Sequence, residues 1–144
     1  MKVEIREGFA DVEVIIRCAE ETEKIRKMAA MLQGMDEKLR GAKNGRTHMI
    51  DRQDVFYFEA VDRRHFIYTE KDAYETQLKL YELEDRLSDA GFFRSSKSQI
   101  INISKIASLC PDFDGRMEVV MKNGEKLIVS RQYSKPLKER LGLK

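Results

Sequence analysis

Several features that mark particular protein classes are scarce or missing in this chain of 144 residues. It has two cysteines, Cys18 and Cys110, without a CxxC pair, so we expect two reduced thiols and not a disulfide scaffold. The two histidines, His48 and His65, lie outside any nucleophile motif and do not form a metal-ligand set with the cysteines. No glycine-rich phosphate loop is present. These absences argue against an enzyme, a metal site and a bound cofactor.

Long uncharged apolar runs are also missing, and the first residues, MKVEIREGFADVEV, mix charges with β-branched side chains. We therefore expect no membrane insertion and no secretory signal, and a protein that stays in the cytoplasm. A hydrophobic content of 42% with 36% charged residues fits a soluble globular protein rather than a disordered chain. The length suits one domain with a small accessory segment.

The formal net charge of +2 conceals a separation of charge along the chain. Residues 94–144 contain eleven Lys or Arg and five Asp or Glu, a net charge of +6, so residues 1–93 carry −4. A basic C-terminal third suits a polyanionic partner, although many neutral proteins also have a lysine-rich face.

The N-terminal part predicts a β-β-α unit. Apolar residues alternate with charged ones on both sides of Gly8, which predicts a strand, a turn and a strand over residues 3–16. Apolar positions then recur at helical spacing over residues 20–33, with acidic side chains in the first turn and Gly34 placed to end the helix.

The turn-rich run GAKNG at residues 41–45 is expected to separate this unit from a main domain over residues 46–144. We expect residues 1–45 to form a dimerisation or docking element. Phosphate would repel their many acidic side chains, and the methionine-rich face of the predicted helix can adapt to a partner surface. The alternative is that this face only covers part of the main domain.

The main domain predicts short strands with two helices. The aromatic and β-branched runs at residues 55–60 and 65–69 predict a hairpin, and Thr76 is expected to begin an amphipathic helix that Gly91 ends. Further short strands are expected around residues 92–94, 99–101, 106–109, 117–122 and 125–129.

The dipeptide Asn123-Gly124 predicts a two-residue hairpin turn, with the flanking residues Lys122 and Glu125 opposite each other. The chain after residue 129 is expected to be helical. Pro136 fits the first turn of that helix if Ser134 is the N-cap and disturbs its interior if Ser130 is, so the start of the helix stays open.

Two stretches carry a family resemblance: GFFRSSKSQIINISKIASL, from Gly91, and the later DGRMEVVMKNGEKLIVSRQYSKPLKERL. Together with VFYFEA at residues 55–60, they resemble the LytTR family of bacterial DNA-binding transcription regulators over about residues 46–143, and the motifs are specific in combination. The resemblance implies an α+β fold, mostly antiparallel β, in which small stacked sheets with short helices follow the N-terminal β-β-α unit. It also implies that loops, and not a recognition helix, enter successive major grooves of DNA.

Three segments carry over as DNA-contacting by resemblance. Their residues are Arg63, Arg64 and His65 in the first, Arg94, Ser96, Lys97 and Ser98 in the second, and Ser130, Arg131 and Gln132 in the third. Lys97 matches the most regular base-contacting position, whereas Ser96 departs from the family pattern, in which His is usual. The residue types agree with this assignment, because Lys and Arg donate to guanine, Gln pairs with adenine, and Ser suits phosphate.

Each of these residues also has an ordinary structural explanation. Lys97 could be a solvated loop lysine, Arg63 and Arg64 a charged hairpin tip, His65 a structural histidine, and Arg131 and Gln132 helix-surface residues. In the same way, Asn102 fits a turn former better than a contact.

The sequence therefore predicts a sequence-specific double-stranded DNA-binding transcriptional regulator that is not an enzyme and acts as a homodimer on paired repeats. Residues 1–45 are too few for the phosphoacceptor receiver domain that often precedes a LytTR domain, so phosphorelay control is not expected. The alternative is a protein-interaction or ligand-sensing module whose basic surface is incidental.

Overall fold

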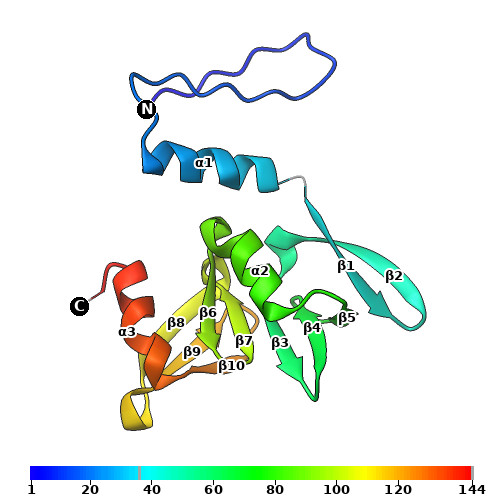
Figure 1. The fold of residues 1–144 in the computed structure, drawn as a ribbon, viewed down its shortest axis with the longest axis vertical. Coiled ribbons are helices and arrows are strands. Elements are labelled where there is room, and N and C mark those ends of the chain that lie inside the picture. The colour runs from blue at the N-terminus through cyan, green and yellow to red at the C-terminus, as the bar shows by residue number, and fades with distance from the viewer. Residues whose placement is uncertain (36, 144) are drawn as a thin grey trace.

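The computed structural model describes residues 1–35 and 37–143, apart from the side chain of Asp89, and confirms an α+β fold dominated by antiparallel strands (Figure 1). Lys144, counted above in the basic third, lies outside the described residues. The α-helices are α1 (Glu23–Gly34), α2 (Leu80–Leu87) and α3 (Arg131–Arg140). The strands are β1 (Lys38–Lys43), β2 (Arg46–Asp51), β3 (Tyr57–Val61), β4 (Arg64–Tyr68), β5 (Ala73–Thr76), β6 (Phe92–Ser96), β7 (Gln99–Asn102), β8 (Ile106–Pro111), β9 (Met117–Met121) and β10 (Lys126–Val129). Short 3₁₀ turns are η1 (Arg52–Asp54), η2 (Ser88–Ala90), η3 (Ile103–Lys105) and η4 (Phe113–Gly115).

The strands form two antiparallel sheets. The larger sheet has the order β2-β1-β5-β4-β3-β7-β6, and the smaller sheet has the order β10-β9-β8. Strand β3 runs antiparallel to β7, with Glu59 opposite Gln99. Because of this direction, the end of β3 and the start of β7 lie at the same end of the sheet, so the β3–β4 and β6–β7 hairpins point their tips the same way.

The two faces of the larger sheet pack against different partners. Side chains of successive residues point to opposite faces of a strand, and Phe58 and Ile100 accordingly belong to a core cluster with Leu83 of α2. Their neighbours Tyr57 and Ile101 belong to a second cluster, which includes the smaller sheet and Leu137 of α3. The central strands are therefore covered on both faces, which fixes their hairpin tips to a rigid body.

Residues 1–22, the N-terminal arm, contain no strand in the structure, so the predicted strand-turn-strand over residues 3–16 is wrong for the single chain. An isolated two-stranded hairpin is marginally stable in water, and the arm has no third strand to pair with. Helix α1 begins at Glu23, later than predicted, because the Thr22 side chain caps it by accepting a hydrogen bond from the Ile25 N–H at 3.3 Å.

The run GAKNG at residues 41–45 covers the end of β1 and the turn to β2, so a joint placed at these residues falls inside the larger sheet. Gly41 lies in β1, which pairs with β2 and also with β5, so the sheet begins at Lys38. The backbone φ angles of Asn44 and Gly45, 52° and 74°, form the turn.

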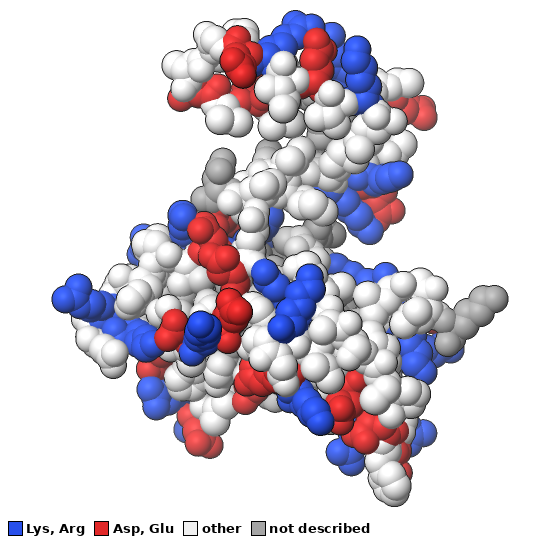
Figure 2. Space-filling view, turned by 180° about the vertical axis from the view of Figure 1, so that it is seen from behind, with Lys and Arg blue, Asp and Glu red and all other residues white. Residues whose placement is uncertain are grey.

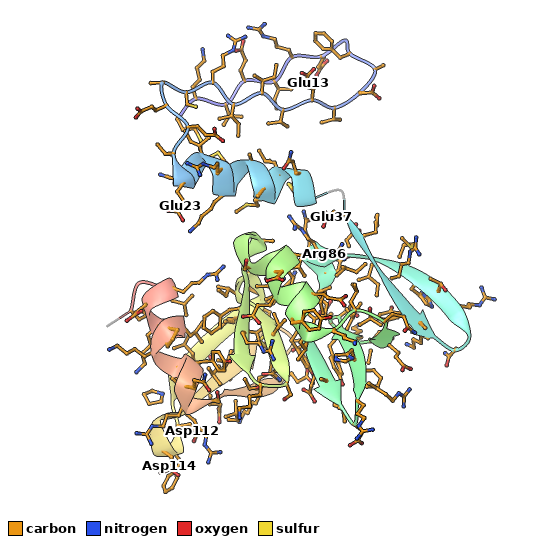
Figure 3. All side chains as sticks on the ribbon, in the orientation of Figure 1. Glu13, Glu23, Glu37, Arg86, Asp112 and Asp114 are labelled. Carbon is orange, nitrogen blue, oxygen red and sulfur yellow. The ribbon has the colours of Figure 1, made fainter. Side chains whose placement is uncertain are left out.

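The end of α1 is attached to the domain by a buried arginine. The Arg52 guanidinium donates a hydrogen bond to the carbonyl oxygen of Met31 at 2.8 Å and lies against Gly34, the one buried residue of the helix. A cation at this end also complements the helix dipole. Arg86 of α2 lies 3.8 Å from Glu37 in the segment that follows (Figure 3).

Thr76 ends strand β5 and does not begin a helix, so that prediction is wrong. Helix α2 begins at Leu80, while the Thr76 hydroxyl accepts a hydrogen bond from the Leu78 N–H at 3.2 Å. Within the described part of the chain, every helix falls short of the length and apolar character needed to cross a bilayer.

The hairpin at Asn123-Gly124 is confirmed, but its register differs from the prediction. Glu125 lies opposite Met121, whose N–H bonds to the Glu125 carbonyl at 2.8 Å, so the connection has three residues with Gly124 at φ 88°. The predicted pair of Lys122 with Glu125 is therefore wrong. Glu125 instead accepts a hydrogen bond from the Tyr57 hydroxyl at 2.8 Å.

The start of the C-terminal helix is also settled. Ser130 is the N-cap residue of α3, and Pro136 lies inside the helix. The missing N–H of Pro136 leaves the Gln132 carbonyl without its usual helical donor. The Ser134 hydroxyl, two residues before Pro136, donates to the Ser130 carbonyl at 3.1 Å and reinforces the first turn.

Candidate nucleic-acid interface

The first predicted segment is the two-residue turn between β3 and β4. Asp62 and Arg63 both have positive φ, 50° and 65°, which is the backbone of a type I′ turn. Asp tolerates this conformation, but an arginine in it is uncommon. Arg63 is exposed at the tip. Unusual backbone held by a well-paired hairpin is a feature of binding sites, which makes the tip a candidate contact.

Arg64 and His65, next along β4, are held in the sheet. The Arg64 guanidinium donates two hydrogen bonds to Glu75 of β5, at 3.1 and 2.7 Å, and lies over the ring of Phe66 with its carbon 5.2 Å from the ring centre. These bonds hold the pKa of Glu75 below its usual range, so the carboxylate stays ionised and keeps Arg64 in place. His65 is half-buried and paired between Ala60 and Thr76.

The second segment is the β6–β7 turn, and Lys97 lies at its tip. Lys97 and Ser98 are exposed, and they join Ser96 to Gln99 in a two-residue connection. The Ser96 hydroxyl accepts a hydrogen bond from the Ser98 N–H at 3.2 Å. A serine therefore shapes the turn at the position where the family has histidine, and its side chain is occupied within the turn.

Arg94 holds this turn in place through hydrogen bonds from its side chain. Its guanidinium donates to the carbonyl oxygens of Ser96 and Lys97, at 2.7 and 2.5 Å, and to the carboxylate of Glu84 on α2 at 2.9 Å. The side chain is only 19% exposed. Its donors are thus directed at the protein, and the rigid fork of an arginine suits two adjacent carbonyls and a carboxylate.

A β-bulge at Ser95 links the turn to its surroundings. The buried Ser95 hydroxyl contacts the Gln99 carbonyl and side-chain oxygens at 3.2 and 3.0 Å, and Gln99 donates to Glu59 of β3 at 3.2 Å. Bulges re-aim side chains and are common beside active or binding sites. This buried polar chain joins β6, β7 and β3 beneath the tips.

The third segment is the start of α3. Arg131 and Gln132 are exposed in its first turn, while Tyr133 points inward and meets the edge of the Phe93 ring with 6.5 Å between ring centres. The aliphatic part of Arg131 lies beside Gly115 of η4, where an added Cβ would be 3.1 Å from its Cγ. Gly115 has a φ of 78°, so a side chain there would be strained as well as crowded.

Backbone hydrogen bonds bring these three segments to one end of the domain, which we call the contact edge (residues 61–65, 94–98 and 130–132). The Ala60 N–H donates to the Ser98 carbonyl at 2.8 Å, and the Ser130 N–H donates to the Ser95 carbonyl at 3.0 Å. Figure 1 shows the two hairpin tips and the start of α3 along its lower side. Arg94 and Gln132 also border one groove of about 380 Å³ between α2 and α3.

Other parts of the surface differ from the contact edge in their charge. The acidic residues Asp112 and Asp114 lie around η4, below the start of α3 in Figure 3. A second groove, of about 620 Å³, mixes charges of both signs, including Asp72, which pairs with Lys43, and Lys105. Among residues 1–35 and 37–143, no group of three His, Cys, Asp or Glu side chains could hold a metal ion.

Four residues that hold the predicted site residues in place were not found from the sequence. Glu75 was missed because β5 was predicted as part of a loop and helix start, and Glu84 because nothing in α2 signals a contact with β6. The buried Ser95 and Gln99 were missed because the bulge changes the face of the sheet to which side chains point, which strict alternation does not predict. Asn102, interpreted as a turn former, is buried and donates to the Val55 carbonyl at 2.8 Å while its oxygen accepts from Ser104, which confirms its structural role.

The fold of this chain matches a solved DNA-binding domain. The chain is similar to a LytTr DNA-binding domain from Bacillus cereus, with a TM-score of 0.71, 25% sequence identity, and coverage of 75% of this chain and 99% of that one. This similarity defines a DNA-binding domain. The LytTr DNA-binding domain family matches residues 45–142. The chain therefore belongs to the LytTR family, as its motifs predicted.

Curated relatives agree with this assignment. A sensory transduction protein LytT from Enterococcus faecalis is 31% identical over 98 residues, covering 68% of this chain and 40% of that protein. A LytT protein from Bacillus anthracis is 36% identical over 93 residues, covering 65% and 38%. An uncharacterized HTH-type transcriptional regulator from Staphylococcus aureus is 33% identical over 96 residues, covering 67% and 65%. The chain thus spans about two fifths of the length of the LytT relatives.

The helix-turn-helix description of the Staphylococcus aureus relative differs from the architecture seen in this chain. In the described residues, strands separate each α-helix from the next in the order of elements. A helix-turn-helix needs two helices joined by a turn of three or four residues. The solvent-facing candidates for DNA contact are instead the hairpin tips and the first turn of α3.

Proposed function

We propose that this protein is a sequence-specific double-stranded DNA-binding transcriptional regulator that reads successive major grooves with its contact edge. One observation carries the proposal: the hydrogen bonds from Ala60 to Ser98 and from Ser130 to Ser95 tie three segments with exposed basic or amide side chains to one end of a β-rich body. A rigid set of side chains at fixed spacing suits a regular polymer such as the DNA duplex. Membership of a DNA-binding family supports the same conclusion.

The residues of the contact edge have different proposed roles. Lys97, Arg63 and Gln132 are exposed and can donate to base edges in the major groove, as can Arg131. Arg64 and His65 lie on β4, behind the tip of the hairpin, and suit phosphate or a neighbouring base. The hydroxyls of Ser98 and Ser130 suit phosphate oxygens, and the Ser96 hydroxyl, which accepts from the Ser98 N–H, still has its own proton to donate to one. Phosphate contacts fix orientation and carry no sequence information.

Arg94 acts through the turn that it holds, because its donors already bond to the Ser96 and Lys97 carbonyls. It is a positioning residue for Lys97 in this proposal. Ser96 replaces the imidazole usual in the family by a hydroxyl that closes the turn, so recognition at this point rests on Lys97 and the backbone.

We further propose that the protein acts as a homodimer on paired repeats, in the cytoplasm of a bacterial cell. Curated relatives from bacteria are named as regulators and sensory transduction proteins. A dimer would match paired half-sites through its own symmetry. The N-terminal arm, residues 1–22, has six acidic and three basic side chains, lies outside the contact edge and is available to join two copies.

Selection from a random duplex pool, followed by competition binding at fixed salt, tests the DNA-binding proposal. The selected sequence should bind at least about 1,000-fold more tightly than a scrambled duplex of equal length. Equal affinity for both would refute sequence-specific recognition. Preferential binding of single-stranded RNA in the same competition would assign the basic edge to a different nucleic acid.

A further inference from the structure

The N-terminal arm exposes an unusual amount of apolar surface. Of the fifteen large hydrophobic side chains exposed among the described residues, nine lie within residues 1–35, including Val12 at 97%, Val14 at 60% and Ile15 at 66%. Large contiguous apolar patches on a soluble protein mark interaction sites. In Figure 1 the arm runs out and back beyond α1, on the side of the helix away from the sheets.

Helix α1 leaves part of its apolar stripe uncovered as well. Gly34 is its one buried residue, whereas Ile25, Met28 and Leu32 are half-buried and Met31 is exposed. Uncharged side chains are prominent between the arm and the body in Figure 2. The arm and α1 thus share a surface that the single chain does not bury.

The backbone of the arm also lacks partners. Within the described chain, the backbone hydrogen bond made by residues 1–22 is that of the Thr22 carbonyl with the Arg26 N–H, at 3.0 Å, which belongs to the start of α1. The alternation of residues 11–17, DVEVIIR, nevertheless has the period of a β-strand. An extended segment with free N–H and C=O groups is a template for pairing with another strand.

The order of residues in this segment makes it complementary to itself at five of its seven positions, the exceptions being Glu13 and Ile15, which lie opposite each other. If two copies of residues 11–17 run antiparallel about Val14, Asp11 of one copy lies opposite Arg17 of the other, at both ends of the pairing. Val12 then lies opposite Ile16, and Val14 meets Val14 at the centre. Opposite charges and β-branched pairs facing each other across strands are both stabilising. In a parallel, in-register pair, Asp11 would lie beside Asp11 and Arg17 beside Arg17, so that like charges would repel.

We propose that residues 11–17 form an antiparallel strand pair with the same residues of a second copy of this chain, with the two-fold axis at Val14. Such an interface uses the same patch on both copies, as two-fold dimers do. Pairing places Val12, Val14 and Ile16 on one face of the new sheet, where the apolar side of α1 can cover them. The inference rests on the proposed homodimer and names its interface, but it does not require DNA.

Charge exchange in the full-length protein tests the register. Sedimentation equilibrium at micromolar concentration should show a dimer for the wild type, and Asp11→Arg or Arg17→Asp should each raise the dimer Kd at least about tenfold by opposing like charges twice. The double exchange Asp11→Arg/Arg17→Asp should restore the dimer. Glu7→Arg, a reversal elsewhere in the arm, should leave the Kd unchanged.

Disulfide trapping gives an independent readout. In a background with Cys18→Ser and Cys110→Ser, Val14→Cys should form a covalent dimer under mild oxidation, because paired Cα atoms in antiparallel strands lie about 4.5–5.5 Å apart, within the disulfide range. Val12→Cys is the control. In the proposed register, position 12 of one chain lies four residues along the strand from position 12 of the other, roughly 13 Å away, so this variant should cross-link poorly.

The outcomes separate the interface from the proposed function. A dimer that survives each single charge reversal, or a Val12→Cys variant that cross-links as well as Val14→Cys, overturns the strand pairing and leaves the homodimer intact. A monomer at all concentrations overturns both. Unchanged binding of every variant to a single DNA half-site shows that the contact edge still folds, so the failure would lie in the arm alone.

Discussion

Replacement of Arg94 by lysine separates a residue that positions Lys97 from one that touches DNA. Arg94 donates to the Ser96 and Lys97 carbonyls and to Glu84, and its side chain is 19% exposed. Lysine keeps the charge but has neither the planar fork nor the number of donors needed to bind both carbonyls and the carboxylate. The β6–β7 turn should therefore remain in the sheet but lose its fixed tip.

The expected magnitude follows from what the turn loses. Water can reach the freed carbonyls, because Lys97 and Ser98 are exposed, so each lost hydrogen bond should lower the free energy of unfolding by about 0.5–1 kcal/mol. The larger effect is on binding. Ordering the backbone of two released turn residues costs about 1 kcal/mol each, so specific DNA affinity should fall roughly 30-fold.

Fluorescence anisotropy with the selected and a scrambled duplex, over a range of salt concentrations, provides the assay. Arg94→Lys should weaken the selected duplex alone, and Arg94→Gln should leave the slope of log K against log salt unchanged, since no phosphate contact is removed. Arg86→Lys, on the outside of α2, is the matched control. If Arg94→Gln lowers the slope by about one and weakens both duplexes equally, Arg94 binds phosphate and the positioning role is refuted.

Three further changes follow from the same contacts. Glu75→Gln should free Arg64 and raise affinity for any duplex several-fold at low salt. Because Arg64 lowers the pKa of Glu75, the ion pair of the wild type is intact above the ordinary carboxyl value of 4.5 and is lost only as the pH falls through the lowered value. The ratio of variant to wild-type affinity should therefore be the same at each pH from 5.5 to 7.5, and a ratio of one would contradict the role of Glu75. Ser95→Ala removes a buried donor and should lower the free energy of unfolding by about 1–2 kcal/mol, a fall in Tm of about 3–6 °C in thermal melts; an unchanged Tm would show that the buried chain is not stabilising. Gly34→Ala places a Cβ 2.1 Å from the Arg52 guanidinium and should release α1, seen as faster amide exchange in residues 23–34, whereas protection equal to the wild type would contradict the attachment.

Local patterns were sufficient to predict the β3–β4 hairpin of the larger sheet and the β9–β10 hairpin of the smaller sheet. The aromatic runs of β3 and β4 and the strands on either side of Asn123-Gly124 follow from alternation and turn chemistry, both of which depend on neighbours in the sequence. Helix α1 follows in the same way from its spacing of apolar residues. The positions of the three contact segments came from the family resemblance, and the turns that carry them are where the motifs predicted.

The β1–β2 hairpin is a local pairing that was missed because GAKNG was interpreted as a joint between two units. The other missed features depend on distant partners. Strand β5 has four residues, and it is a strand because β4 and β1 pair with its two sides. The register at Glu125 depends on a third loop residue and on the hydroxyl of Tyr57, 68 positions away. The bonds of Arg64 to Glu75 and of Arg94 to Glu84 likewise join different elements, which a single sequence cannot reveal.

Interference footprinting on the selected duplex tests the central claim, that three segments on one edge read successive major grooves. Methylation of guanine N7 probes the major groove, and hydroxyl-radical cleavage probes the backbone. The account predicts guanines whose methylation blocks binding in patches about 10 base pairs apart, on one face of the duplex, with the patch assigned to Lys97 lost in Lys97→Ala. A single continuous patch, minor-groove protection alone, or a pattern unaltered by Lys97→Ala would contradict it.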